Sequence, residues 1–388
     1  MMDKKKVFLI YEFLSEQGGL EREIINHANF LEEKGYEVKV LTCHFDKKIL
    51  EQLPFGDIKI ESISKFKTGV EWLDMGLCFL GFNNLREQEP DAFLSYSFPS
   101  NFLIRKKKGT KIDYVNHFPH YLYLNDKEKL EWASGTQGAK RWITVAMSWF
   151  LGDWMKRLDK KLLLTNKLIF MNSEFTKKKL DKLYGLKDTK VSTPPLDPRF
   201  DKPSDKKIKE KFIFSSSRII PDKKYEWLIE SMVSMKHKIP LYLAGSVEDN
   251  YKKSLLALAS EKKVELKFLG RLNTDEIKVY YGAAEVFAFP TPGEDFGLVP
   301  AESMACGTPV IVWGDGAGPT EQVIDGKTGY HAKPYDKNDF AAKMDKVIDT
   351  GMKKKNRAKI INSAKRFSAG EVKKGFMKEV DRLFSFGS

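Results

Sequence analysis

The chain has 388 residues, 42% of them hydrophobic and 12% aromatic, with a formal charge of +13 at pH 7. This length exceeds what one hydrophobic core usually supports, so we expect two domains. No stretch approaches the roughly 18 consecutive apolar residues of a membrane-spanning helix. The three cysteines lack metal-ligand spacing, which favours reduced thiols in the cytoplasm.

The positive charge is concentrated in the second quarter of the chain. Residues 1–100 carry 12 basic and 17 acidic side chains, whereas residues 101–200 carry 21 basic and 10 acidic. No zinc module, basic zipper or RNA-binding aromatic motif accompanies this excess, so nucleic acid is not expected as a partner. The excess would attract an anionic membrane surface or a phosphorylated acceptor, and a lysine-rich solvated surface is the alternative explanation.

Short apolar runs alternate with helical patterns along the chain, which is typical of βαβ units and parallel sheets. The first half contains predicted strands at 7–13, 38–42, 58–63, 92–96, 112–117 and 168–171. The second half contains predicted strands at 212–216, 241–244, 266–269, 286–290 and 310–313. A proline-rich stretch, 191–198, separates the two sets and breaks helix and strand alike. We therefore predict an α/β protein with two Rossmann-like domains, 1–192 and 193–370.

The first predicted strand runs into a loop with two adjacent glycines, Gly18 and Gly19, and a helical pattern follows at 24–31. Paired glycines at a strand-to-helix turn let the backbone approach a ligand closely. The loop lacks the three-glycine dinucleotide fingerprint, so NAD is not expected. A tight turn without a ligand is the alternative.

A second loop, 116–121, follows the strand that begins at Ile112 and contains two histidines. A histidine at the carboxyl end of a strand can hydrogen-bond a sugar hydroxyl or orient an acceptor. At this point both His117 and His120 are candidates. The alternative is a loop histidine bonded only to nearby backbone.

The stretch 142–164 has apolar residues at helical spacing and ends in a basic cluster of Lys156, Arg157, Lys160 and Lys161. An amphipathic helix with tryptophans and a basic end could lie on a membrane surface. A core helix of the first domain fits the same apolar spacing, so both interpretations remain open.

Arg218 and Lys223 follow the predicted strand 212–216, again at a carboxyl end. A guanidinium offers bidentate geometry to phosphate, and an ammonium adds a mobile point charge. Such fixed cations can stabilise negative charge where other enzymes use a divalent metal. No Asp-x-Asp element stands at a plausible site, so we predict no metal ligands and no cofactor.

The stretch 288–307 is the most informative one. It leaves a buried strand, passes Glu294 and a Phe296-Gly297-Leu298 turn, and enters a helix near Pro300 that carries Glu302. Two carboxylates thus bracket a helix N-terminus, where N–H groups and the dipole attract anions. A capping carboxylate beside one exposed glutamate is the alternative.

The stretches 288–307 and 217–223 together resemble the two-glutamate signature and the arginine–lysine element of family 4 glycosyltransferases. These are retaining enzymes of the GT-B fold, in which two Rossmann-like domains face each other across a cleft. The resemblance covers nearly the whole chain and is closest to the mannosyltransferase branch that uses GDP-mannose. It implies that 371–388 forms a helix that crosses back to the first domain.

The resemblance also implies roles for individual residues. Glu302 would bind the ribose hydroxyls of the donor, and Glu294 a hydroxyl of the transferred sugar. Arg218 and Lys223 would hold the diphosphate, and His117 would contact the donor sugar. The predicted catalytic residues are Glu294, His117, Arg218 and Lys223. The full donor-binding set is Gly18, Gly19, Arg218, Lys223, Gly270, Arg271, Glu294, Phe296, Gly297, Leu298 and Glu302.

One departure from the family pattern lies near residue 318. The family commonly has a glycine pair followed by a glutamate, whereas this chain has Gly318-Pro319 before Thr320 and Glu321. We therefore interpret Glu321 as structural.

The predicted function is transfer of a hexose, with mannose favoured, from a nucleotide-diphosphate sugar to a glycan or lipid-linked acceptor. The expected location is cytoplasmic, with peripheral contact to the inner face of the membrane as a further hypothesis. A GT-B nucleotide-sugar epimerase and a non-catalytic nucleotide- or nucleic-acid-binding protein are the alternatives.

Overall fold

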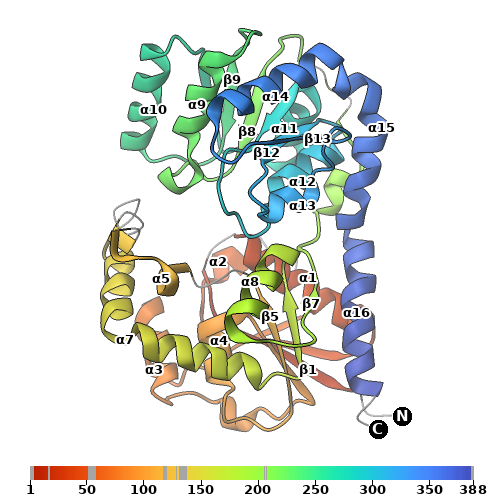
Figure 1. Ribbon diagram of the computed structural model, residues 1–388. Helices are drawn as coiled ribbons and strands as arrows, with labels where there is room; N and C mark the ends of the chain where they lie inside the picture. Colours follow the sequence, from red (N-terminus) through yellow and green to blue (C-terminus); the bar gives the residue numbers. More distant parts are fainter. Residues whose placement is uncertain are drawn as a thin grey trace. The chain divides into compact units, whose positions relative to one another are not determined.

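A computed structural model describes residues 4–15, 18–50, 58–116, 120–127, 129–130, 138–204, 206 and 208–385. The chain forms two compact units. Unit 1 comprises Met1–Leu122, Leu151–Pro195 and Val372–Ser388, and unit 2 comprises Tyr123–Phe150 and Leu196–Glu371. Each unit is built on one sheet of parallel strands (Figure 1).

Unit 1 contains a seven-stranded sheet in the order β3-β2-β1-β4-β5-β6-β7. Neighbouring strands pair in parallel, and the order reverses between β1 and β4, which makes this a doubly wound sheet. The strands are β1 (Lys6–Leu14), β2 (Glu37–Phe45), β3 (Lys59–Ser62), β4 (Ala92–Ser95), β5 (Thr110–Val115), β6 (Leu168–Met171) and β7 (Lys190–Val191).

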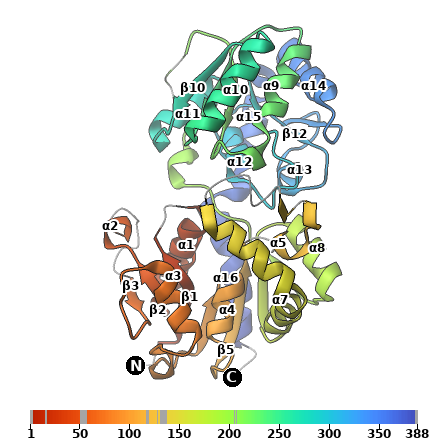
Figure 2. The ribbon, with the colours of Figure 1, turned by 90° about the vertical axis from the view of Figure 1, so that its left-hand side faces the viewer.

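Helices cover both faces of the unit 1 sheet. One face packs on α1 (Gly19–Glu33) and on α16 (Ala369–Ser385), whose Phe376 and Val380 are buried in the core. The opposite face packs on α3 (Glu71–Phe79) and α4 (Ser97–Leu103). Figures 1 and 2 place the second half of α7 on the same side as α3 and α4. The remaining helices of this part of the chain are α2 (Lys47–Leu50), α5 (His120–Tyr123), α7 (Gly138–Leu164) and α8 (Glu174–Tyr184).

Unit 2 contains a six-stranded parallel sheet in the order β10-β9-β8-β11-β12-β13. Its strands are β8 (Ile213–Ser216), β9 (Leu241–Ala244), β10 (Leu266–Gly270), β11 (Val286–Ala288), β12 (Val310–Trp313) and β13 (Gly329–Ala332). Its helices are α9 (Tyr225–Ser234), α10 (Asp249–Glu261), α11 (Thr274–Ala283), α12 (Leu298–Ala305), α13 (Gly318–Gln322), α14 (Lys337–Thr350) and α15 (Met352–Ala364).

The strands of unit 2 end where the sequence becomes rich in polar and glycine residues. Their buried runs form two apolar clusters, one on each face of the sheet. Because the strands are parallel, the loops after β8, β11 and β12 emerge at one edge, and the strand order reverses between β8 and β11. Ligands of such sheets bind at this edge, near the reversal.

The predicted α/β class with two Rossmann-like sheets is confirmed. Each predicted strand has a counterpart within a few residues, whereas β7 and β13 were not predicted. In the part of the chain that the structure describes, no helix combines the length and the apolar character needed to cross a bilayer.

Candidate functional site

The loop after β11 leads directly into α12 at the edge where the strand order reverses. The helix begins at Leu298, two residues before Pro300, and Gly297 is its N-cap with φ +70°. This backbone conformation favours glycine. A glycine N-cap has no side chain of its own to accept from the first N–H groups of the helix, and helix N-termini of this kind suit an anionic ligand.

The structure brings together two predicted residues from distant positions in the sequence, Lys223 and Glu294. Lys223 ends a short 3₁₀ turn after β8, and its Nζ donates a hydrogen bond to Glu294 Oε2. The side chains are 18% and 21% exposed, so the pair is neither fully buried nor freely solvated. Thr291 Oγ1 lies 3.4 Å from the carbonyl oxygen of Lys223 and links the two loops further.

Glu302 lies in α12 and is much less accessible than Glu294, with only 8% of its surface exposed. Tyr281 OH donates to Glu302 Oε2 at 2.8 Å, and Ser216 Oγ lies 2.7 Å from the same hydroxyl. Burial, together with the nearby Glu302 carboxylate, raises the pKa of Tyr281 well above its ordinary value. The tyrosine therefore stays protonated as a donor. Tyr281 occupies an ordinary helical position within α11, so no sequence pattern pointed to it.

A short segment, 315–322, holds the loop that carries Glu294, and we call it the brace. The N–H of Gly318 donates to the Glu294 carbonyl oxygen at 2.9 Å. The fully buried Gln322 donates through Nε2 to the carbonyl oxygens of Phe296 and Gly297, at 2.6 and 2.8 Å. The brace thus fixes the backbone on both sides of the turn that opens α12.

Asp315 provides the other end of the brace. Its Oδ2 accepts from the N–H of Gly293 at 3.0 Å, and its Oδ1 accepts from the N–H of Ala317 at 3.1 Å. Sequence reasoning noted Gly318 and Glu321 here but missed Asp315 and Gln322. An aspartate in the short loop between a strand and a helix, two residues before the helix N-cap Ala317, is a signal that could have identified Asp315.

The other predicted donor-binding residues of unit 2 lie farther along the same edge. Arg218 is exposed in the loop after β8. Gly270 ends β10, two strands away from β8, with φ +73°, and its carbonyl oxygen accepts from the N–H of Gly245 at 2.8 Å. Arg271 follows it and is exposed. These residues occupy strand ends, as expected for an extended ligand on this edge.

In unit 1, Gly18 and Gly19 stand at the N-terminus of α1. The N–H of Gly18 donates to Glu21 Oε2 at 2.9 Å, and Glu21 is buried. A carboxylate of the protein thus already engages this turn, which sequence reasoning did not foresee. The predicted residue His117 lies outside the described residues.

A second carboxyl group, Glu12, lies near the carboxyl end of β1. Ser100 Oγ donates to Glu12 Oε2. Burial raises the pKa of Glu12 to about 7, against the opposing effect of the Ser100 hydrogen bond, and the carboxylates of Glu21 and Glu71 raise it further. Sequence reasoning did not single out Glu12 as a functional residue. Its position within an apolar strand is the only signal available.

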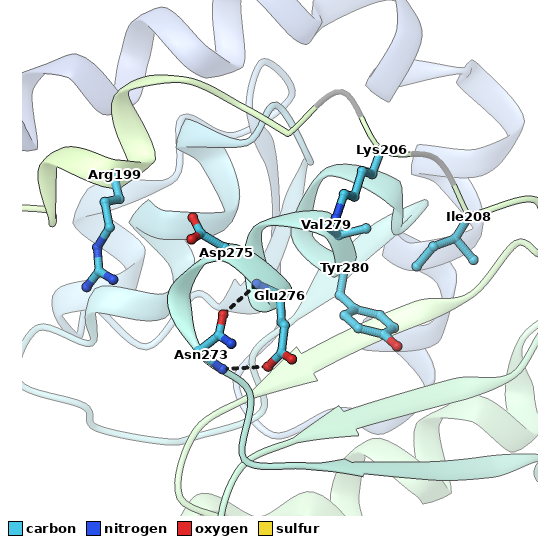
Figure 3. Close-up of a pocket in the computed structure, with 8 residues that line it drawn as sticks. All are labelled: Arg199, Lys206, Ile208, Asn273, Asp275, Glu276, Val279 and Tyr280. Atoms are coloured by element: carbon cyan, nitrogen blue, oxygen red, sulfur yellow. Dashed lines mark hydrogen bonds between the residues drawn. The ribbon is translucent and has the colours of Figure 1, made fainter.

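A cavity of about 410 Å³ lies beside α11, and neither Glu294 nor Glu302 is among its lining residues (Figure 3). It is lined partly by Asn273 and Glu276, which form a reciprocal capping box with two hydrogen bonds of 2.9 Å. The N-terminus of α11 is therefore capped by its own side chains, in contrast to that of α12. Among the described residues, no group of three or more His, Cys, Asp or Glu side chains is arranged to hold a metal ion.

Two family models match the chain in succession. The model described as Glycosyltransferase Family 4 matches residues 17–195, and the model described as Glycosyl transferases group 1 matches residues 197–367. The chain is 34% identical to an uncharacterized glycosyltransferase of Methanocaldococcus jannaschii over 162 residues, which is 40% of either protein.

Longer matches extend over nearly the whole chain. An alpha-1,3/1,6-mannosyltransferase of Neurospora crassa is 24% identical over 409 aligned positions, covering 89% of this chain and 83% of the relative. Among solved structures, a sucrose-phosphate synthase from Thermosynechococcus elongatus superposes with a TM-score of 0.76 at 16% identity, covering 98% of this chain and all of that one. At this identity, the structural likeness establishes a shared fold.

Proposed function

Because the chain belongs to glycosyltransferase family 4 and has the GT-B fold, we propose that this glycosyltransferase is a retaining mannosyltransferase that uses GDP-mannose. The observation that carries the proposal is the Lys223–Glu294 pair at the glycine-capped N-terminus of α12. A cation, a carboxylate and a helix N-terminus at one place suit a ligand that joins a diphosphate to a sugar.

The donor's diphosphate would be held by positive groups of unit 2. Lys223 can exchange its contact with Glu294 for a phosphate oxygen, since the pair is partly solvated and the ammonium is mobile on its stem. Arg218 would add a bidentate contact. The first N–H groups of α12 would face the same anion, because the helix dipole and the backbone donors act together at a helix N-terminus.

The two glutamates would accept hydrogen bonds from the donor's hydroxyl groups. Release of Lys223 to the diphosphate leaves the Glu294 carboxylate able to accept from the transferred sugar. Glu302 is oriented by Tyr281 and would accept from the ribose. These contacts fix the anomeric carbon relative to the diphosphate, and such positioning can supply much of the rate acceleration.

In the proposed reaction, the acceptor hydroxyl attacks on the face from which the phosphate departs, and a phosphate oxygen takes its proton. The C1–O bond to phosphate breaks as the new glycosidic bond forms, so the sugar is retained in configuration. No protein nucleophile takes part. The role of Lys223, Arg218 and the α12 N-terminus is to stabilise the negative charge that develops on the leaving diphosphate.

The choice of mannose is supported by the mannosyltransferase relative, which aligns over most of the chain. Thermal shift with GDP-mannose, GDP, UDP-glucose and ADP-glucose tests the donor, because preferential binding raises the melting temperature. GDP-mannose should give the largest shift and should slowly release GDP without acceptor. A larger shift with UDP-glucose would overturn the mannose assignment.

Thermal shift and GDP release together distinguish transfer from the two competing functions. An epimerase would convert the nucleotide sugar into a stereoisomer without releasing free nucleotide. A non-catalytic binding protein would show the thermal shift and no turnover. Either result would contradict transfer as the function.

We also propose that α7 contacts an anionic membrane surface, where a lipid-linked acceptor would be found. The apolar residues of 142–164 do not form a single buried face, since Phe150 and Trp154 are exposed, whereas Val145 and Met155 are buried. The helix is apolar on more than one side, and the side that packs against the protein is the one with Val145 and Met155. Arg157, Lys160 and Lys161 are exposed farther along the helix.

This outward face combines aromatic and basic side chains, as in helices that lie at a bilayer surface. Flotation with vesicles tests the contact. Protein should associate more with anionic than with neutral vesicles, and salt should weaken the association. Replacing Lys156, Arg157, Lys160 and Lys161 with glutamine should reduce it. Absence of binding to anionic vesicles at low salt would contradict the proposed contact.

A further inference from the structure

A second apolar surface lies in unit 1, around α3. Large side chains within a short stretch of sequence face solvent there, with Trp72 61% and Leu80 77% exposed. We call this group the α3 patch, and it consists of Phe66, Val70, Trp72, Leu73, Leu80 and Phe82. Isolated exposed apolar residues are ordinary, but a cluster of this size in one region indicates an interaction surface.

The α3 patch is held in place by a buried carboxylate. Asp74 Oδ1 accepts from the N–H and the Oγ1 of Thr68, both at 2.8 Å, and Asp74 Oδ2 lies 2.9 Å from His44 Nδ1. Burial opposes ionisation of Asp74, but the hydrogen bonds from His44 and Thr68 lower its pKa below the ordinary value. The loop before α3 is therefore anchored to the helix and to β2.

The two ends of the patch are also joined. The N–H of Lys65 donates to the carbonyl oxygen of Phe82 at 3.2 Å, and the rings of Phe66 and Phe82 are 5.7 Å apart. Asn83 Nδ2 donates to the carbonyl oxygen of Cys78 at 2.8 Å, which closes the turn after α3. The inward side of the helix is already buried through Cys78. The outward side chains are thus presented on a fixed backbone.

The charges beside Phe66 favour an anionic partner. Lys65 and Lys67 flank this ring and are exposed, whereas the chain after Phe82 carries exposed charges of both signs, Arg86, Glu87 and Glu89. The two acidic residues of α3 are engaged within the protein, since Asp74 is buried and Glu71 Oε2 accepts from Ser15 Oγ at 2.5 Å. The cations are therefore concentrated beside Phe66, and both carboxylates of α3 have partners within the protein.

The patch also lies on the same side of the unit 1 sheet as the outward face of α7. Successive right-handed crossovers from β3 to β6 place α3, α4 and residues 151–164 of α7 in one layer, as Figures 1 and 2 show. Trp154, in that part of α7, is exposed. A flat, fluid partner can meet both groups without matching their detailed shapes.

We propose that the α3 patch is a second membrane-binding surface, which inserts its aromatic and leucine side chains into the interface of an anionic bilayer. This inference rests on the membrane contact proposed for α7. The two surfaces would bind the membrane through different forces. The basic end of α7 supplies mainly electrostatic attraction, whereas the α3 patch supplies apolar burial, which salt does not screen.

The test is flotation with vesicles of phosphatidylcholine containing phosphatidylglycerol, using the full chain. Trp72→Ser/Leu80→Ser should lower the partition coefficient about tenfold or more, because two large apolar side chains no longer insert. The matched control is Val233→Ser/Leu256→Ser, which removes two side chains of unit 2 that are 43% and 41% exposed. The control should change binding less than about twofold.

Further measurements separate failure of this inference from failure of the α7 contact. If wild-type protein does not float with anionic vesicles, both proposals are wrong. If the α7 glutamine variant loses binding while Trp72→Ser/Leu80→Ser binds like wild type, only the α3 patch proposal is wrong. GDP release from GDP-mannose and the melting temperature should be unchanged in the patch variant, which shows that the fold is intact.

A second copy of the chain is the competing occupant of the patch. Light scattering after gel filtration would then show a dimer in the wild type and a monomer in Trp72→Ser/Leu80→Ser, with vesicle binding unaffected. That combination would overturn the membrane assignment.

Discussion

Replacing Gly318 with alanine tests how the loop that carries Glu294 is positioned. A Cβ at this position would lie 2.2 Å from the carbonyl oxygen of Asp295 and 2.6 Å from Phe296 Cα. Heavy atoms in contact are normally about 3.5 Å apart. Because the obstructing atoms belong to the backbone, the loop or α13 must move by roughly 1 Å to accept the methyl group.

This displacement should affect catalysis more than folding. A misplacement of about 1 Å in a catalytic group can cost about 100-fold in rate, which corresponds to about 3 kcal/mol of transition-state stabilisation. Overpacking of this kind usually costs about 1–3 kcal/mol of stability, so the melting temperature should fall by several degrees while the protein stays folded. Release of GDP from saturating GDP-mannose reports kcat, and circular dichroism reports the melting temperature.

The matched control is Gly282→Ala, also in unit 2. A Cβ there would have no neighbour closer than 3.9 Å, and the residue lies within α11. Alanine should therefore keep full activity and raise stability by about 0.5–1 kcal/mol. Asp315→Asn adds no atoms to the loop but weakens the acceptor for Gly293, so a tenfold loss of kcat is expected. If Gly318→Ala turns over within about threefold of the control, the brace does not position Glu294.

Three further predictions concern individual charges. Lys223→Ala or Arg218→Ala should reduce turnover at least about 100-fold with the fold intact. Near-normal rates in both variants would show that these residues do not belong to the site. EDTA should leave the activity of the wild type largely unchanged. Glu302→Gln should mainly raise the donor KM and Glu294→Gln should mainly lower kcat, and steady-state kinetics with varied donor would reveal a reversed assignment. The raised pKa of Glu12 means that the folded state keeps a proton that the unfolded chain loses, so this group's contribution to stability declines as pH rises from 4.5 through about 7. Glu12→Gln should remove up to about 3 kcal/mol of that decline, measured as urea unfolding at pH 5 and pH 8; an unchanged pH dependence would show that Glu12 ionises normally.

Most of the fold could be predicted because the strands of parallel sheets are nearly continuous apolar runs. Short or interrupted strands were missed because they contain no such continuous apolar run. β7 has only two residues and ends at the start of the proline-rich stretch 191–198, and β13 begins with Gly329 directly after a turn. The edge strands β3 and β10 were predicted, so short length and a glycine start, rather than edge position, explain why β7 and β13 were missed.

Only part of the candidate site could be predicted. Lys223 and Glu294 stand out because each follows a strand of the same sheet, and parallel strands bring their carboxyl ends to one edge. Tyr281 and Gln322 could not be found in this way. They lie within helices and act through contacts with residues far away in the sequence, which helical periodicity does not encode. The role of the brace can therefore be identified only in the folded structure.

The two glutamates are distinguished by their surroundings rather than by their spacing. Glu294 is one-fifth exposed and pairs with a mobile ammonium, so its partner can change as charge moves onto the leaving diphosphate. Glu302 is nearly buried and is fixed by Tyr281, which is itself held by Ser216. A fixed hydrogen-bond acceptor such as Glu302 stabilises the bound substrate and the transition state equally. Glu294 can stabilise the transition state selectively, because its partner Lys223 is released to the reacting phosphate. Replacing Tyr281 with phenylalanine should therefore resemble Glu302→Gln and raise the donor KM with kcat nearly unchanged, and a fall in kcat instead would show that Glu302 acts on the reacting centre.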